Sequence, residues 1–419
     1  MKIASWKLGL CAAAAAFPLM AFAGLDQALQ AYEKGDYATM KKELLSCAET
    51  DPECAFNLGA TYVNGLGVTP NHTEEFKWFL KAAQAGHALA QHNIGEMYRL
   101  GQGVNVDYDQ AIQWYSKAIK QGAGEPMVSL AQMYLTGEGV QASPEKSFQL
   151  MATAANQGLA KAQHNLAIYY LQGIGTPVNK PGAVIWFRKA AEQGIADAQY
   201  NVGYFLANGI ETTKDEKQAF VWLEKAAHQG VPNAQLMLSE MYGKGTVAVP
   251  KNAAWATRWA AAAARSGKPD VSEQAQAAIP GYLAKLTKLK VLGNKAQLLE
   301  KPESAAKVLG KLKSGQTLYR LEPGSSFVEA YSPEGHLVGF VKTDFVQTVE
   351  PVANKKPMQQ ANSNFPPRPA GQPGRTVCAT KCFNAQCFRT YSDGRQVQFT
   401  ARQVWDSFSN SYKFDSGSC

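Results

Sequence analysis

The chain has 419 residues, of which 46% are hydrophobic and 18% are charged, so it can bury a core and is not wholly disordered. Its length predicts two to four domains. The formal net charge is +8, and residues 351–419 contribute +6 of it through nine basic and three acidic residues, so the positive charge is concentrated in the tail.

Residues 1–23 have the pattern of a secretory signal peptide. Lys2 and Lys7 precede an uncharged apolar run, and Ala21-Phe22-Ala23 forms an A-x-A cleavage site. A membrane anchor is the alternative, but this run is short for a bilayer span and no later run approaches that length. We therefore expect cleavage after Ala23. The mature protein is expected to be periplasmic or secreted, not to span a membrane and not to bind nucleic acid.

Two helices are expected before the main part of the chain, within residues 24–51, as a cap. Cys47 and Cys54 lie near the end of one predicted helix and the start of the next. Six cysteines remain after the signal peptide is removed, and an even number outside the cytosol predicts three disulfides. We expect Cys47 and Cys54 to form one of them, and two free thiols are the alternative.

Residues 52–280 carry an internal repeat with a period of 36 residues. Each period contains two segments with apolar residues at helical spacing, joined by a glycine-rich turn. One such hairpin is too small to bury its apolar face, so the pattern predicts hairpins stacked into an α-solenoid. The residues that keep the step are Gly86, Gly122, Gly158, Gly194 and Gly230; Gly65, Gly101, Gly137, Gly173, Gly209 and Gly245; Tyr62, Tyr98, Tyr134, Tyr170 and Tyr242; and Trp78, Trp114, Trp186 and Trp222.

Two stretches of this repeat carry a family resemblance. AKAQHNLAIYYLQGIGTPV, residues 160–178, and GAVIWFRKAAEQG, residues 182–194, resemble the Sel-1-like repeat, a relative of the tetratricopeptide repeat. The resemblance covers about residues 52–267. It implies an all-α repeat protein that binds other proteins. Exported Sel-1-like proteins rich in cysteine are similar to this chain in pairing cysteines across helices.

Residues 286–350 change to short alternating apolar runs broken by Gly and Pro, which predict a small all-β barrel. The order VLGKLKSGQTLY, FVEAY and GHLVGFVKTDFV resembles the bacterial SH3-like domain over about residues 288–349. That resemblance implies a cell-wall peptide as the ligand. Phe340 stands where the family usually has the Trp of a G-W-V motif.

The end of the chain is predicted to hold a linker and a small module. Residues 351–374 are rich in Pro, Gln and Asn, which is typical of an extended linker. Residues 375–419 are basic, and Ser392-Asp393-Gly394 predicts a hairpin turn. So short a module needs cross-links, so we expect two disulfides, with the pairing left open. The four cysteines are Cys378, Cys382, Cys387 and Cys419.

Zinc is the rival interpretation of the C-terminal cysteines. Their C-x3-C-x4-C spacing lacks a C-x2-C pair, and no His lies in residues 375–419, so we expect no metal and no other cofactor.

One motif raises the question of an enzyme. Ser143-Pro144-Glu145-Lys146 matches the S-x-x-K of penicillin-recognising enzymes. A Ser before Pro is also typical of a helix N-cap followed by Pro in the first turn. The partner motif S-D-N is absent from the sequence. We therefore expect no enzyme, and a penicillin-binding or β-lactamase-like activity is the less favoured alternative.

The candidate binding residues are those that vary between repeats. In AQHNIGEMYRLGQGV, residues 90–104, three polar side chains lie on one side of a predicted helix. The equivalent positions in later repeats become aromatic, as a groove that binds a peptide or protein would show. A solvated or packing face is the alternative. The candidates are His92, Glu96, Arg99, Gln132, His164, Tyr200 and Tyr204.

The sequence therefore predicts an exported, non-enzymatic scaffold or adaptor at the cell envelope. It would bind a protein or peptide partner through the concave face of the solenoid. The alternative is a cell-wall protein that binds peptidoglycan through the SH3-like domain and the basic tail.

Overall fold

The structure is a computed structural model that describes residues 23–349 and five strands between residues 377 and 415. The chain divides into two units, residues 1–350 and residues 351–419. The predicted signal peptide and linker lie outside the described residues, apart from Ala23.

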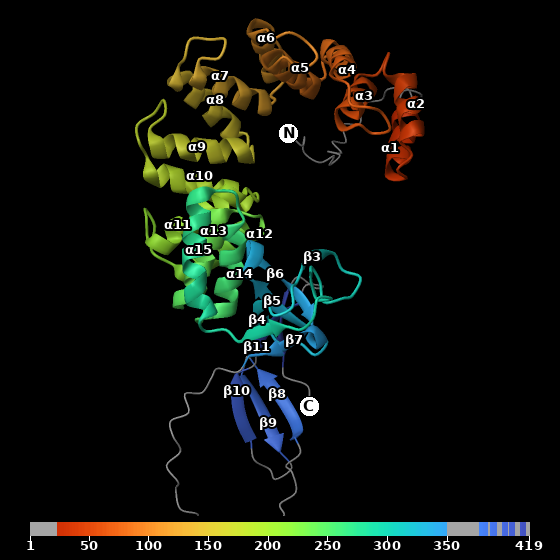
Figure 1. The fold of residues 1–419 in the computed structure, drawn as a ribbon. Coiled ribbons are helices and arrows are strands. Elements are labelled where there is room, and N and C mark those ends of the chain that lie inside the picture. The colour runs from red at the N-terminus through yellow and green to blue at the C-terminus, as the bar shows by residue number, and fades with distance from the viewer. Residues whose placement is uncertain are drawn as a thin grey trace, which may run out of the picture. The chain divides into compact units, whose positions relative to one another are not determined.

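Fifteen α-helices occupy the described residues from 23 to 283, and they follow one another as helix–turn–helix pairs (Figure 1). This arrangement confirms the predicted helical repeat solenoid. The helices are α1 (Ala23–Glu33), α2 (Tyr37–Cys47), α3 (Pro52–Asn64), α4 (His72–Gln84), α5 (Ala88–Leu100), α6 (Tyr108–Lys120), α7 (Glu125–Thr136), α8 (Pro144–Asn156), α9 (Ala160–Gln172), α10 (Lys180–Glu192), α11 (Ala196–Asn208), α12 (Glu216–His228), α13 (Pro232–Lys244), α14 (Ala253–Ala264) and α15 (Pro269–Leu283).

Local signals set the ends of the helices in each repeat, as α5 and α6 illustrate. Gly101 ends α5 in the left-handed conformation with φ of 69°, and its N–H donates to the carbonyl of Met97. Asp107 is the N-cap of α6, and its carboxylate accepts the backbone N–H of Gln110 at 2.9 Å. Such caps satisfy backbone groups that a helix end leaves free. The hairpin is therefore encoded locally, and its apolar face is left to its neighbours.

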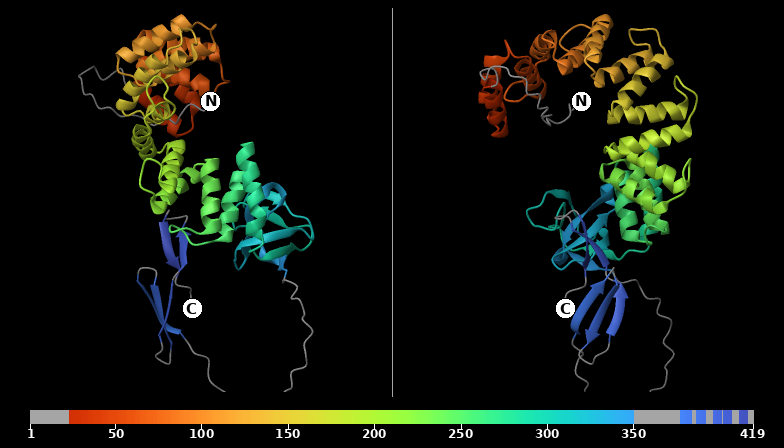
Figure 2. Two further views of the ribbon diagram at one scale, coloured as in Figure 1. Left: turned by 90° about the vertical axis from the view of Figure 1, so that its left-hand side faces the viewer. Right: turned by 180° about the vertical axis from the view of Figure 1, so that it is seen from behind.

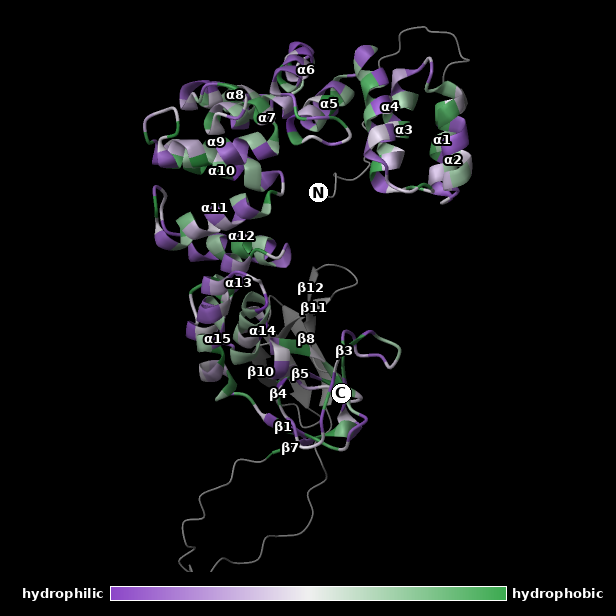
Figure 3. Ribbon diagram, turned by 45° about the horizontal axis from the view of Figure 1, so that its top comes forward, coloured by the Kyte–Doolittle hydropathy of each residue, from purple (hydrophilic) through white to green (hydrophobic). Residues whose placement is uncertain are grey.

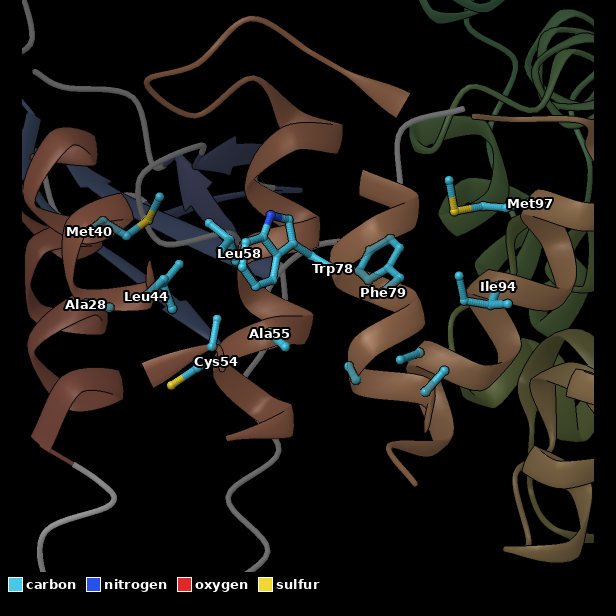
Figure 4. Packing of buried hydrophobic residues seen from close by; sticks show 14 of the residues in the cluster. Ala28, Met40, Leu44, Cys54, Ala55, Leu58, Trp78, Phe79, Ile94 and Met97 are labelled. Carbon is cyan, nitrogen blue, oxygen red and sulfur yellow. The ribbon is translucent and has the colours of Figure 1, made fainter. Parts of the chain in front are cut away.

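The core runs from one hairpin into the next. Met40, Leu44, Leu58 and Phe79 come from three successive helices, α2, α3 and α4, and are at most 2% exposed in one cluster (Figure 4). Each helix packs mainly against the helices before and after it. Because burial of apolar area supplies most of the stabilisation, neighbouring repeats stabilise each other.

A disulfide joins the first hairpin to the second, which confirms the predicted pair. Cys47 at the end of α2 is bonded to Cys54 in α3, with 5.8 Å between their Cα atoms. The bond therefore fixes the turn of residues 48–51 between these two helices.

A seven-stranded antiparallel sheet follows the last helix, which agrees with a small β domain. The strand order is β3-β2-β6-β5-β4-β1-β7. Its SH3-like identity remains a prediction. The strands are β1 (Lys288–Val291), β2 (Gln297–Leu299), β3 (Val308–Lys311), β4 (Thr317–Glu322), β5 (Phe327–Ser332), β6 (Leu337–Lys342) and β7 (Val346–Thr348).

This sheet is fused to the end of the solenoid rather than tethered to it (Figure 2). Leu321 and Tyr331 share a buried cluster with residues of α14 and α15. Arg258 of α14 pairs with Glu329 of β5, and both side chains are 14% exposed. The sheet thus covers the apolar end of the last hairpin.

The second unit consists of short antiparallel strands. They are β8 (Val377–Phe383), β9 (Gln386–Tyr391), β10 (Gln396–Thr400), β11 (Arg402–Asp406) and β12 (Ser411–Asp415). β9 pairs with β10, on either side of the predicted turn at residues 392–394, which lies outside the described residues. The register of β8 and β9 places Cys382 opposite Cys387. The side chains of the four C-terminal cysteines lie outside the described part, so their disulfides stay a prediction.

Among the described residues, no helix combines the length and hydrophobicity that crossing a membrane requires. Each helix carries both hydrophilic and hydrophobic residues along its length (Figure 3).

The contact between α5 and α6 predicts a size limit at Gly95. A Cβ at this position would lie 2.5 Å from Cε1 of the buried Tyr115. Gly95→Ala is therefore expected to lower the free energy of unfolding by about 1–3 kcal/mol, as overpacking does. Chemical denaturation measures the change.

Gly281→Ala is the matched control, because a Cβ there meets nothing within 4 Å in α15. It is expected to be neutral or to stabilise by about 0.5–1 kcal/mol. Equal losses in the two variants would contradict the packing argument.

Candidate functional site

The first three candidate residues form one polar cluster on α5, centred on Glu96. One carboxylate oxygen of Glu96 accepts from Nη2 of Arg99 at 2.7 Å, and the other accepts from the Tyr115 hydroxyl at 2.7 Å. Nε2 of His92 lies 3.7 Å from the same carboxylate. Both oxygens of Glu96 are therefore occupied within the chain.

The same cluster reaches into the next repeat. Nε2 of His92 lies 3.2 Å from the hydroxyl of Ser129 on α7. Nη1 of Arg99 donates to Glu138, in the turn after α7, at 3.2 Å. The side chains of His92, Glu96 and Arg99 are only 19–23% exposed. These residues therefore connect two hairpins.

The electrostatics of the cluster favour fixed charges. Burial raises the pKa of Glu96, but hydrogen bonds from His92, Ser129, Arg99 and Tyr115 outweigh it and hold that pKa well below its ordinary value. Burial, reinforced by the charge of Glu96, raises the pKa of the Tyr115 hydroxyl. Burial lowers the pKa of Arg99, but its contact with Glu96 outweighs this effect and raises it. Glu96 and Arg99 thus form an ion pair at neutral pH, and Glu96 is poorly suited to act as a base.

The later candidates lie in a different environment. Gln132 on α7 is exposed. The ring centroid of His164 on α9 lies 5.5 Å from that of the buried Phe187. Burial lowers the pKa of His164, so its ring is neutral at pH 7.

Two aromatic side chains continue this surface on α11. The ring centroids of Tyr200 and Tyr204 are 6.1 Å apart, and Tyr204 is 39% exposed. Burial and the neighbouring Tyr204 raise the pKa of Tyr200, so its hydroxyl stays protonated at neutral pH. Ile168 and Leu171 of α9 are partly buried in the same cluster as α10 and α11 residues. Helices α9 and α11 thus carry an aromatic surface, and Asp197 of α11 acts electrostatically on His164 at one side of it.

The S-x-x-K motif lies at the start of α8, where its serine caps the helix. The hydroxyl of Ser143 accepts the backbone N–H of Lys146 at the start of α8. The ammonium of Lys146 lies over the ring of Tyr134, 5.2 Å from its centroid. These contacts support the N-cap interpretation of Ser143.

Within residues 23–349 and the described strands, no three His, Cys, Asp or Glu residues are grouped so that they could hold a metal ion.

Sequence reasoning missed three members of the Glu96 cluster: Tyr115, Ser129 and Glu138. Tyr115 is a buried core residue of α6 whose hydroxyl also donates to Glu96. Ser129 and Glu138 lie 37 and 39 residues from the side chains they meet, close to one repeat period. A search for polar residues separated by one repeat period plus a few residues would have found both pairs.

The sequence model of the Sel1 repeat matches six successive segments of the chain: residues 52–87, 88–122, 127–159, 160–195, 196–231 and 232–268. The chain belongs to the Sel1 repeat family. Proteins built from Sel1 repeats typically act as protein-interaction scaffolds and are generally not catalytic.

Two solved structures resemble part of this Sel1 repeat protein. A protective antigen of uropathogenic Escherichia coli is 32% identical with a TM-score of 0.51, and the match covers 61% of this chain and 56% of that one. A Sel1 repeat protein from Oxalobacter formigenes is 29% identical with a TM-score of 0.54, covering 57% of this chain and 98% of that one. No curated protein matches the sequence.

The Glu96 cluster predicts a pH-dependent contribution to stability. Because the pKa of Glu96 is lower in the folded state, its contribution is complete above the unfolded value of about 4.3 and is lost as the pH falls toward the folded value. Glu96→Gln is therefore expected to be less stable than wild type at pH 7. That difference should shrink between about pH 5 and pH 3 in urea denaturation.

Glu240→Gln is the matched control, since Glu240 occupies the equivalent position of the sixth repeat but is 48% exposed. It should change stability little at either pH. A Glu96→Gln variant that behaves like Glu240→Gln would show that the cluster contributes nothing to folding.

Proposed function

We propose that this Sel1 repeat protein is an exported scaffold that binds a protein or peptide through the face of α9 and α11. The observation that carries the proposal is the aromatic pair Tyr200 and Tyr204, of which Tyr204 is 39% exposed. Tyrosines offer a large, stiff contact area with a polar tip, which makes them frequent anchors of protein interfaces. His164 of the preceding repeat extends this surface.

The proposal divides the predicted binding residues into two groups. His92, Glu96 and Arg99 are engaged with Tyr115, Ser129 and Glu138, so binding a partner through them would first require breaking these contacts. Binding is therefore assigned to His164, Tyr200 and Tyr204. Gln132, which is exposed, comes between the two groups of residues in the sequence.

The chemistry of the surface favours an uncharged apolar segment of the partner. His164 is neutral because burial lowers its pKa, and the raised pKa of Tyr200 keeps its hydroxyl protonated. Ile168 and Leu171 add aliphatic area. Binding to such a surface should depend little on salt, since screening acts on charges.

Two features support the proposal of export. The first 23 residues have the pattern of a signal peptide. The Cys47–Cys54 disulfide is the kind of cross-link that persists in an oxidising compartment. None of the described contacts favours the alternative of peptidoglycan binding.

The experiment is an affinity capture from envelope extract by the full chain, read by mass spectrometry. Tyr200→Ala combined with Tyr204→Ala is expected to keep the helical circular dichroism spectrum and to lose the captured partner. The loss follows because both aromatic anchors are removed.

Ile185→Ala combined with Val221→Ala is the matched control, because these side chains are 57% and 49% exposed on α10 and α12 of the same repeats. The control should retain the partner. If it loses the partner while the tyrosine variant keeps it, the face of α9 and α11 is not the binding surface.

A further inference from the structure

Buried glutamines link consecutive hairpins at four places in the solenoid. Each lies near the start of a repeat's first helix and donates its amide to a carbonyl near the end of the preceding helix. All four are at most 9% exposed, so these hydrogen bonds are shielded from water. The pairs are Gln91 with Ala83 (3.1 Å), Gln163 with Ala155 (3.3 Å), Gln199 with Ala191 (3.1 Å) and Gln235 with Ala227 (3.1 Å).

A second glutamine holds three of these links in place. The amide of Gln121 donates to the side-chain oxygen of Gln91 at 2.8 Å. Gln193 and Gln229 do the same for Gln163 and Gln199, also at 2.8 Å. Each linking glutamine in these pairs therefore both donates and accepts, and its orientation is fixed.

The link is missing between the second and third repeats. Met127 of α7 occupies the position of the linking glutamine and is 5% exposed. Its thioether has no proton to donate. Ile119 of α6 is the equivalent acceptor, and within the described residues its carbonyl receives no side-chain amide. The junction of α6 with α7 thus lacks the buried hydrogen bond of the other four.

The Glu96 cluster stands at this same junction. Here α7 also contacts α5 directly. His92 meets Ser129 on α7, and Arg99 meets Glu138 in the turn after α7, so the bridge runs from α5 to α7 and its following turn. Arg99 and Glu138 are 19% and 28% exposed, so water and salt reach this pair more easily than the buried glutamines.

We propose that the junction of α6 with α7 is a hinge, about which helices α1–α6 move relative to the helices that follow, and that the Arg99–Glu138 pair is its latch. We infer the hinge because a partly exposed ion pair at this junction replaces the buried hydrogen bond found at the other four. Opening there breaks no buried glutamine hydrogen bond, whereas opening at any of the four linked junctions breaks one.

The test compares two distances measured by electron–electron double resonance on the full chain. Labels are attached to p-acetylphenylalanine, so that the native cysteines are untouched. One pair is Lys77 with Gln149, which spans the hinge; the other is Gln149 with Val221, which spans two linked junctions. All three positions are exposed on the second helices of repeats one, three and five, so both pairs span two repeats.

The hinge predicts a broader distance distribution for the first pair than for the second. Met127→Gln restores the link and should narrow the first distribution to the width of the second. Glu138→Gln releases the latch and should broaden the first distribution alone. Gln163→Met removes a link elsewhere and should broaden the second distribution alone.

Equal widths for the two pairs in the wild type would overturn the proposal. So would a Glu138→Gln variant that leaves the first distribution unchanged. If Met127→Gln does not fold, as its circular dichroism would show, Glu138→Gln and Gln163→Met still decide the question.

Discussion

The structure depends on contact between successive hairpins. A single pair of helices has one apolar face and nothing of its own to cover it, and the buried clusters accordingly run across repeat boundaries. Within a hairpin, small residues let the two helices approach closely, as Gly95 of α5 does beneath the ring of Tyr115 of α6. Which side chains of the solenoid remain exposed therefore depends on which of them the neighbouring hairpins cover.

The regular part of this arrangement was predictable because it repeats. Gly101 and Asp107 are capping residues that set where a helix ends or begins. Such capping signals recur every 36 residues, and this regular recurrence distinguishes them from chance occurrences. The helical repeats and the Cys47–Cys54 bond were therefore accessible from the sequence, and the β domain was expected from its alternating pattern.

The candidate site was less predictable because it arises where the repeat is broken. The sequence shows Glu96 as a polar residue, but the position of the Tyr115 hydroxyl depends on how α5 and α6 pack within one hairpin. The position of Glu138 depends on how two hairpins pack. Spacing along one helix showed that His92, Glu96 and Arg99 share a side, without showing that partners from other helices occupy them. Met127 is likewise an ordinary core residue until its equivalents are seen to be hydrogen-bonded glutamines.

The junction between α14 and the β sheet has a consequence for self-assembly. A stack of similar hairpins can in principle be extended by a second copy, whose first hairpin would continue the row into a filament. Leu321 and Tyr331 already occupy the apolar end of the stack, and the Arg258–Glu329 pair fixes the sheet there. Head-to-tail polymerisation through this end is therefore blocked by the chain itself.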